Sequence, residues 1–425
     1  MRSVQILVIG GGASGMMAAI TAAKAGGKVL LIEKLNRLGK KILATGNGKC
    51  NFTNSYQDKS CYRGEDRNFA WEALQEFSQQ KTLELFHEMG ILAKEREGYF
   101  YPASGQAASV LDALTRQLEK YQVEVQCGEQ VVSIELAGSD RKKNKKAFSS
   151  GKHAYLVTTG QGKYLAQKVI LAVGGKAAPV HGTTGDGYAV AKGLGLTVIP
   201  PLPALTSCAL KGDFMKDWTG VRVQGRVSLY SKKNGLLAED QGELQMVAYG
   251  ISGIPVFQVS RYAAKALQQG EKPYFVMDIM TEYTEEELAE ELSCRKKKFS
   301  DWRALDALDG MMHRKLASVL LHSLGMNPKQ SVGQWTESEM KRIVHRIKAW
   351  KLGIAAVSDF DKAQVTCGGV ATAQLDCHTM EVTEHPGLYV TGELLDVDGI
   401  CGGYNLQWAW TSGYLAGRAA AARTE

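Results

Sequence analysis

The chain has 425 residues, of which 44% are hydrophobic and 22% charged, and its formal net charge is +7. This length and ordinary globular composition predict two or three domains with ample core. Because no uninterrupted apolar run approaches the roughly 18 residues of a membrane span, we expect no membrane segment. The apolar stretch 4–9 runs directly into Gly10 and is too short for a signal peptide.

Cysteine usage and charge bear on compartment and partners. The chain has eight cysteines, none in a CxxC pair, and is too large to need disulfide staples. We therefore expect the reducing cytoplasm. The net charge of +7 favours a soluble surface with excess lysine, and a polyanionic partner is the alternative.

The first 33 residues predict a βαβ unit. Residues 4–9 are a short, apolar, β-branched run typical of a buried strand. The Ala-rich residues 14–25 predict a helix that ends at the glycine pair 26–27, and residues 28–33 predict a second buried strand. This is the context that a dinucleotide-binding glycine turn requires.

A GxGxxG turn joins the first strand to the helix. Gly10 permits the tight turn, Gly12 lets the backbone approach a pyrophosphate, and Gly15 lets the helix pack on the strand. Ala13 and Ser14 open the helix, whose N–H groups point at the phosphates. An acidic residue, Glu33, ends the second strand and suits ribose hydroxyls, which disfavours NADP at this turn.

A Gly- and Asn-rich loop follows at 39–54. Its glycines and side-chain amides predict a loop rather than a regular element. We expect it to line the pyrophosphate or the ring of a dinucleotide, and an ordinary surface loop is the alternative. The expected ligand residues are Lys40, Lys41, Gly46, Asn47, Gly48, Cys50 and Asn51.

The middle of the chain alternates predicted helices and strands. Periodicity and turn residues predict helices over 71–89 and 106–120, and strands around 122–136, 154–159 and 167–173. The lysine run 140–146 predicts a solvated hairpin tip, with nucleic-acid contact as the alternative. Gly174 and Gly175 end the last of these strands, and the segment resembles a second FAD signature. A helix over 188–194 follows.

The residue pattern changes near 198, where prolines mark a crossing between domains. Short alternating runs over 206–280 predict a β-rich unit, and charged helical patterns fill 284–350. Gly-rich strand and turn texture returns from 365. We predict a dinucleotide-binding domain at 1–197 and 365–425, interrupted by a β-rich domain at 198–283 and a helical domain at 284–364.

The C-terminal segment predicts the second half of the same site. Residues 387–391 predict the last strand, and a Gly- and Asp-rich turn leads into a helix over 406–422. A helix N-terminus here would stabilise negative charge on a reduced flavin ring. The glycines around Asp396 and Asp398 argue against a glycosidase pair. The candidate ligands are Gly392, Glu393, Asp398, Gly403, Tyr404 and Asn405.

Two thiols and one imidazole complete the candidates. Cys401 and Cys50 are packed thiols beside the flavin, proton donors to substrate, or a redox relay. His181 has no second ligand at metal spacing, so we expect no metal site.

The motifs together resemble the BaiN-like bacterial flavoproteins, which are NAD(P)/FAD-dependent oxidoreductases that include aminoacetone oxidase-like members. The resemblance runs from the first strand to the last helix. GNGKCN and GELLDVDGICGGYN are its specific segments. Two departures concern substrate-side contacts: Ile254 separates GISG from Pro255, and Tyr99 stands where arginine is common.

The resemblance implies an α/β fold in which a Rossmann-like FAD-binding domain is broken by a β-barrel-like domain and a small helical domain. It puts Gly10, Gly12, Gly15, Glu33 and Lys34 at the ADP, and the GNGKCN loop with Asp398, Gly403 and Asn405 near the isoalloxazine.

The resemblance also implies three activities: reduction of C=C bonds in 3-oxo bile-acid intermediates, aminoacetone oxidation, and dihydrouridine formation in ribosomal RNA. We expect an FAD-dependent reductase of a carbonyl-conjugated C=C bond that acts on a small-molecule enone or on rRNA. A flavin amine oxidase using O2 is the alternative. Because the chain has a single GxGxxG turn, we expect NADH or NADPH to bind transiently where substrate binds.

Overall fold

A computed structural model describes residues 1–137 and 155–422, which form two compact units. The first unit comprises residues 1–201 and 365–425, and the second comprises residues 202–364. Each unit has its own hydrophobic core. The predicted lysine hairpin tip at 140–146 lies outside the described residues.

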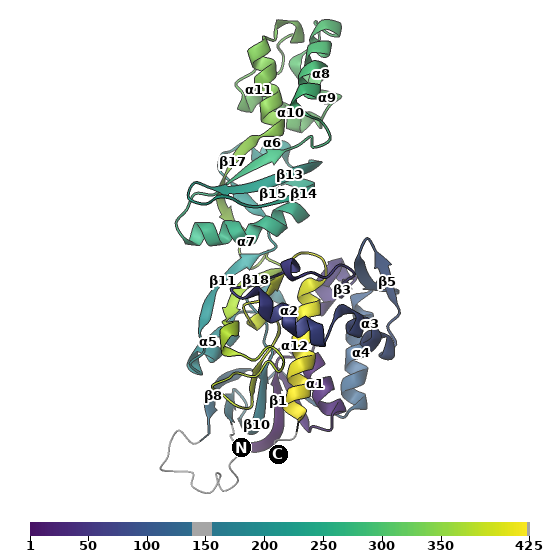
Figure 1. The fold of residues 1–425 in the computed structure, drawn as a ribbon, viewed down its shortest axis with the longest axis vertical. Coiled ribbons are helices and arrows are strands. Elements are labelled where there is room, and N and C mark those ends of the chain that lie inside the picture. The colour runs from purple at the N-terminus through teal and green to yellow at the C-terminus, as the bar shows by residue number, and fades with distance from the viewer. Residues whose placement is uncertain (138–154, 423–425) are drawn as a thin grey trace. The chain divides into compact units, whose positions relative to one another are not determined.

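A seven-stranded sheet organises the first unit (Figure 1). Its order is β7-β2-β1-β10-β9-β8, with β19 paired to β10. The pairs β1–β2, β1–β10, β2–β7 and β10–β19 are parallel, whereas β8 and β9 pair antiparallel. The strands are β1 (Arg2–Ile9), β2 (Val29–Glu33), β7 (Glu124–Cys127), β8 (Val131–Leu136), β9 (Tyr155–Thr159), β10 (Lys163–Leu171) and β19 (Leu388–Val390).

Helices and short strands complete this unit. The helices are α1 (Ala13–Lys24), α2 (Arg67–Glu76), α3 (Gln79–Glu88), α4 (Ala107–Lys120), α5 (Asp186–Gly193) and α12 (Tyr404–Ala421). The short strands are β3 (Thr53–Asn54), β4 (Tyr62–Arg63), β5 (Ala93–Arg96), β6 (Tyr99–Pro102), β18 (Val365–Val370) and β20 (Asp398–Gly399). Strand β11 (Val198–Ala204) pairs with β18, and the boundary between the units falls within it, after residue 201. The Rossmann-like sheet that the sequence predicts is therefore confirmed.

Helix α12 packs along α1 at close range (Figure 1). A Cβ atom built on Gly413 would lie 2.4 Å from the Ser14 backbone oxygen, and one on Gly417 would lie 2.3 Å from that of Ala18. From the first contact to the second, the residue numbers increase along both helices, so α1 and α12 run parallel. The C-terminal helix thus belongs to the same core as the N-terminal βαβ unit.

A closed six-stranded barrel forms the β part of the second unit, as expected. Its order is β12-β15-β14-β13-β16-β17, from strands β12 (Cys208–Leu210), β13 (Arg222–Ser231), β14 (Gly235–Val247), β15 (Gly250–Ser252), β16 (Tyr274–Asp278) and β17 (Trp350–Val357). Its helices are α6 (Met215–Trp218), α7 (Ile254–Gln268), α8 (Glu285–Lys298), α9 (Ala304–Asp309), α10 (Arg314–Ser323) and α11 (Glu337–Lys348). The finer division at 283/284 remains a proposal.

One local prediction is wrong. The helix predicted over 71–89 is two helices, because the Ser78 side chain accepts a hydrogen bond from the Lys81 N–H and starts α3. The β-rich run 206–280 also contains α7, whose N-cap is Gly253 and which carries Pro255 in its first turn. Among the described residues, no helix is both long and apolar enough to cross a membrane.

Candidate flavin site

The GxGxxG turn is fixed by close backbone approach. Gly10 has φ +104°, and a Cβ there would lie 2.4 Å from the Ala172 oxygen at the end of β10. A Cβ on Gly15 would lie 1.8 Å from the Gly10 oxygen. Gly12 differs, because its Cβ position has no neighbouring atom within 4 Å among the described residues, apart from Gly12 itself and the residues next to it in the chain. The first and third glycines therefore serve the fold, whereas the second borders open space.

The same turn begins α1, with Gly12 as N-cap and Ala13 and Ser14 as the first helical residues. No side chain caps this helix. Its first N–H groups are therefore available to an anion.

The acidic residue at the end of β2 holds the turn together. One Glu33 oxygen accepts the Gly11 N–H at 2.6 Å and the other accepts the Leu35 N–H at 2.9 Å. A carboxylate offers about four acceptor positions, so capacity remains for ribose hydroxyls. Lys34 forms an ion pair with Asp186 at 2.9 Å, which ties β2 to the start of α5.

One polar network joins three distant segments of the predicted site. Lys41 Nζ lies 2.7 Å from Glu393 Oε2. The other Glu393 oxygen accepts hydrogen bonds from the N–H and hydroxyl of Thr366, both at 2.9 Å. The Thr366 hydroxyl oxygen in turn accepts the Lys176 and Ala177 N–H groups at 2.8 and 3.0 Å.

This network brings together the loop after β2, the turn that follows Gly174 and Gly175, and the segment that starts at Gly392. A Cβ on Gly175 would lie 2.4 Å from the Thr366 hydroxyl oxygen. The Gly392 N–H donates to Ser412 Oγ of α12 at 3.0 Å. Thr366 and Ser412 are not among the site residues predicted from the sequence, since an isolated hydroxyl carries no spacing signal.

The GNGKCN loop has an unusual backbone. Gly46, Asn47, Gly48 and Cys50 all have positive φ, between 54° and 82°. Asn47 and Cys50 adopt this left-handed conformation against their preference as non-glycine residues. Such backbone costs free energy and is concentrated at ligand-binding segments. The predicted ligand Lys40 lies partly buried just before this loop.

The loop meets the start of α12 through Asn51. Asn51 is 9% exposed, and its Oδ1 is buried without a hydrogen-bond partner among the described residues. A Cβ on Gly403, the N-cap of α12, would lie 2.8 Å from this oxygen. The helix has no side-chain cap. An acceptor without a partner among the described residues therefore lies beside a helix start that has no side-chain cap.

The C-terminal turn is braced from several sides. Asn405 exchanges two hydrogen bonds with the Gly399 backbone, at 2.8 and 3.0 Å. Asp398 is buried in β20, which pairs with β4. Tyr404 is buried in edge-to-face contact with Tyr62. This bracing fixes the residues that the sequence assigns to the flavin ring.

The two candidate thiols differ in accessibility. Cys50 is fully buried, and burial raises the pKa of its thiol to about 12. Cys401 is partly exposed in the turn that leads into α12. Its thiol lies close enough to Tyr101 to contribute to the raised pKa of that phenol, whose main cause is burial. Of the two, Cys401 is the thiol with solvent exposure.

The site fits the dinucleotide that the sequence predicts. Open space at Gly12 and the uncapped start of α1 suit a pyrophosphate. The unpartnered Asn51 Oδ1 beside α12 suits an N–H of a flavin ring. Both features would otherwise leave polar groups unsatisfied.

The chain is similar to known proteins along nearly its whole length. The sequence model of the HI0933-like protein Rossmann domain matches residues 4–419. A 3-dehydro-bile acid delta(4,6)-reductase of Clostridium scindens is 41% identical over 421 residues, 99% of each chain. A ribosomal RNA dihydrouridine synthase of Escherichia coli is 28% identical over 414 residues, 97% of each chain.

The fold is also found among solved structures. The 3-ketosteroid delta1-dehydrogenase of Sterolibacterium denitrificans, in complex with 1,4-androstadiene-3,17-dione, aligns with a TM-score of 0.50 at 12% identity. The alignment covers 99% of this chain and 100% of that one. At this identity the likeness concerns the fold.

Proposed function

The chain belongs to the HI0933-like family, and we propose that this FAD-dependent oxidoreductase reduces a carbonyl-conjugated C=C bond of a steroid-type substrate. The observation that carries the proposal is the identity with the bile-acid reductase, which extends over nearly the whole of both chains. Both the flavin domain and the inserted unit are therefore shared with that enzyme.

When bound, the reduced flavin would supply a hydride from N5 to the alkene carbon distal to the carbonyl, and an acid must protonate the neighbouring carbon. The chain's own groups would divide these tasks. The start of α1 would hold the pyrophosphate, and the start of α12 with Asn51 would hold the ring. Cys401 is the proposed proton donor, since the Cys50 thiol is buried.

The electron donor and the compartment are parts of the same proposal. NADH or NADPH would deliver two electrons to the flavin at the face where substrate later binds, so the two would alternate. The location we propose is the cytoplasm.

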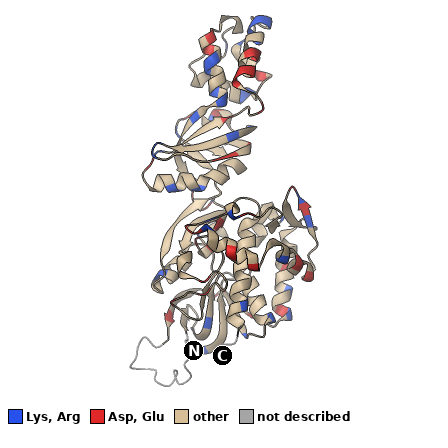
Figure 2. Ribbon diagram, viewed as in Figure 1, with Lys and Arg blue, Asp and Glu red and all other residues tan. Residues whose placement is uncertain are grey.

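Ribosomal RNA is the second candidate substrate, because the uracil C5=C6 bond is also conjugated to a carbonyl and the E. coli relative is named for that reaction. RNA binding would require a basic surface for the phosphates. Figure 2 shows that α8 carries both acidic and basic residues. Helix α8 has acidic residues in its first turn and basic residues in its last.

The test is anaerobic reduction of the holoenzyme with NADH or NADPH, followed by addition of one acceptor at a time. We expect a 3-oxo-4,6-diene steroid to restore the oxidised flavin spectrum and to yield a product reduced at C=C. If only a uridine-containing rRNA fragment reoxidises the flavin, the substrate is RNA and not a steroid. Hydrogen peroxide release with aminoacetone in air, with neither alkene reduced, would overturn the reductase proposal in favour of the oxidase.

A further inference from the structure

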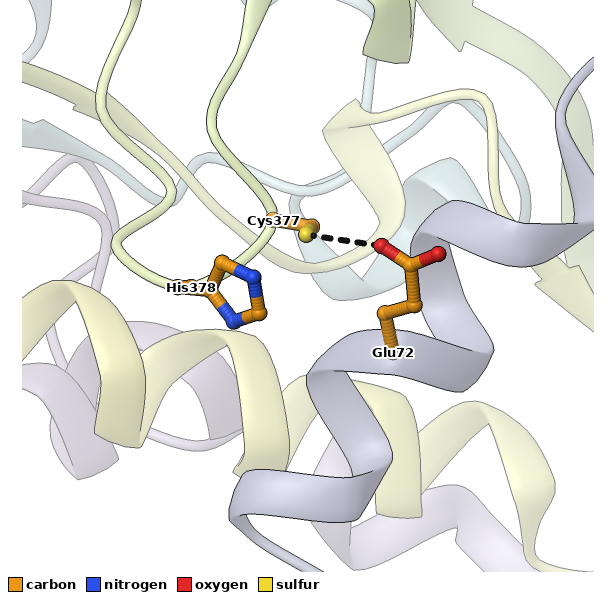
Figure 3. A group of neighbouring side chains, drawn as sticks. All are labelled: Glu72, Cys377 and His378. Atoms are coloured by element: carbon orange, nitrogen blue, oxygen red, sulfur yellow. Dashed lines mark hydrogen bonds between the residues drawn. The ribbon is translucent and has the colours of Figure 1, made fainter.

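A cysteine, a histidine and a glutamate from two distant segments gather on the first unit, away from the residues assigned to the flavin. Glu72 lies on α2, and Cys377 and His378 lie in the turn that follows the short 3-10 helix Thr372–Gln374. One ligand atom from each side chain lies within 4.8 Å of the others. Figure 3 shows the thiol and the imidazole facing the Glu72 carboxylate, with Cys377 Sγ 3.3 Å from Glu72 Oε2.

A carboxylate orients the imidazole. His378 Nδ1 lies 2.5 Å from Oε1 of Glu76, one turn beyond Glu72 on the same face of α2. This contact leaves Nε2 as the imidazole nitrogen for a further partner. A histidine that ligates a metal usually donates its other ring N–H to a carboxylate in this way, which fixes the tautomer and the ring orientation.

The turn is held in place by further hydrogen bonds. Asp376 Oδ1 accepts the His378 N–H at 2.7 Å. Arg418 of α12 donates to the His378 carbonyl at 3.2 Å and pairs with Glu76. The backbone that carries Cys377 and His378 is thus positioned by α2 and α12 independently of any ion.

We propose that Glu72, Cys377 and His378 bind a zinc-class divalent cation, with Glu76 as the carboxylate that positions the imidazole. Zn²⁺ takes thiolate, imidazole and carboxylate ligands at about 2.0–2.3 Å, and three such ligands leave its fourth position to water. The sulfur and nitrogen donors disfavour Mg²⁺ and Ca²⁺, which prefer oxygen.

The bound ion would cross-link α2 to a turn about 300 residues later in the chain. It would therefore stabilise the folded first unit, because it binds a site that the unfolded chain does not present. The site uses none of the residues assigned to FAD, so its test does not depend on the proposed reaction.

The test measures zinc bound to the flavin-loaded enzyme, with Zn²⁺ alone as the probe. The protein is equilibrated at micromolar free zinc, passed through gel filtration, and analysed for metal per chain. We expect a single zinc ion in the wild type, and its loss in Cys377→Ser and in His378→Ala. The control is Cys294→Ser, because Cys294 is an equally half-buried thiol on α8 of the other unit and should keep the ion.

Two carboxylate variants separate binding from folding. Glu72→Gln changes an exposed side chain and should abolish retention, whereas Glu76→Gln should weaken zinc affinity about 10- to 100-fold. Unchanged flavin content in each variant shows that the first unit is folded. Zinc should also raise the thermal unfolding midpoint of the wild type but not of Glu72→Gln. A wild type that retains no zinc, or folded variants that retain as much as the wild type, would overturn the proposal.

Discussion

Gly413 of α12 packs against the backbone oxygen of Ser14 in α1. A Cβ atom built on Gly413 would lie only 2.4 Å from that oxygen. Gly413 is nine residues into α12, whereas Ser14 is one residue into α1. At a rise of 1.5 Å per residue, the starts of the two parallel helices are staggered by about 12 Å. Two helix starts without side-chain caps are thus offset along the direction of the paired helices, which suits the two ends of an extended dinucleotide.

Replacement of this contact glycine should separate the helices. Gly413→Ala introduces a methyl group against rigid backbone, so we expect the free energy of unfolding to fall by about 1–3 kcal/mol and flavin content to fall with it. Urea unfolding and flavin absorbance measure both. Gly193→Ala is the control, because no atom lies within 4 Å of its Cβ position in α5. It should be neutral or stabilise by about 0.4–1 kcal/mol. Equal effects of the two variants would contradict the helix-contact argument.

Substitutions in the GxGxxG turn should distinguish a role in folding from a role in FAD binding. Gly12 has φ −83° and open space at its Cβ position, so Gly12→Ala should fold normally yet bind FAD more weakly. Gly15→Ala places a methyl group 1.8 Å from the Gly10 oxygen and should prevent folding. Equilibrium FAD titration and circular dichroism of both variants measure the difference. A Gly12→Ala protein with wild-type FAD affinity would remove the pyrophosphate from this position.

Local patterns predicted those parts of the fold that depend on neighbours in sequence. The predicted strand 4–9, helix 14–25 and strand 28–33 lie within two residues of β1, α1 and β2 at every end. Helix α4 was likewise expected almost at its observed bounds. Short apolar strands and Gly-terminated helices carry strong local signals.

Contacts between residues far apart in the sequence have no such local signal. The barrel closes through β17, a strand within a region that is otherwise helical, and closure depends on pairing with the distant β12. Lys41 and Glu393 are 352 positions apart, so composition and spacing cannot pair them. Glycines at fixed offsets indicated both ends of the flavin site, whereas single polar residues such as Thr366 become informative only once the chain is folded.

The Lys41–Glu393 ion pair should matter more than a surface pair. Lys41→Met leaves a partly buried Glu393 carboxylate without its cation, so we expect a loss of about 1–3 kcal/mol and weaker FAD binding. Lys24→Met is the control, because the Lys24–Glu88 pair is exposed and its loss should cost about 0.2–1 kcal/mol at most. Chemical unfolding and FAD titration compare the two. Equal losses in both variants would show that the network does not support the site.

Serine substitutions of the two candidate thiols should have different effects on kcat. If Cys401 protonates substrate, Cys401→Ser should lower kcat about 10²- to 10⁴-fold with little change in flavin content. Cys50→Ser places a hydroxyl in the core, so it should lower the unfolding midpoint and leave the kcat of the folded fraction nearly unchanged. Steady-state rates normalised to bound flavin measure both. A large kcat loss in Cys50→Ser alone would reverse the assignment.

His181 should make the protein less stable in acid. Burial, followed by the positive charges of Lys41 and Lys40, lowers the pKa of this imidazole, and its Nδ1 is buried without a hydrogen-bond partner among the described residues. In the unfolded chain the ordinary pKa is about 6.5, so below that pH the unfolded state takes up the proton first. The free energy of unfolding therefore falls as pH drops from about 6.5 to the lower folded pKa, and the contribution is constant above 6.5. Urea unfolding of the flavin-loaded wild type and of His181→Gln across this window should show a smaller loss of unfolding free energy in the variant.

Lys41→Met should also reduce this loss, since it removes one of the charges that lower the His181 pKa. Identical pH slopes in wild type and His181→Gln would exclude His181 as the cause.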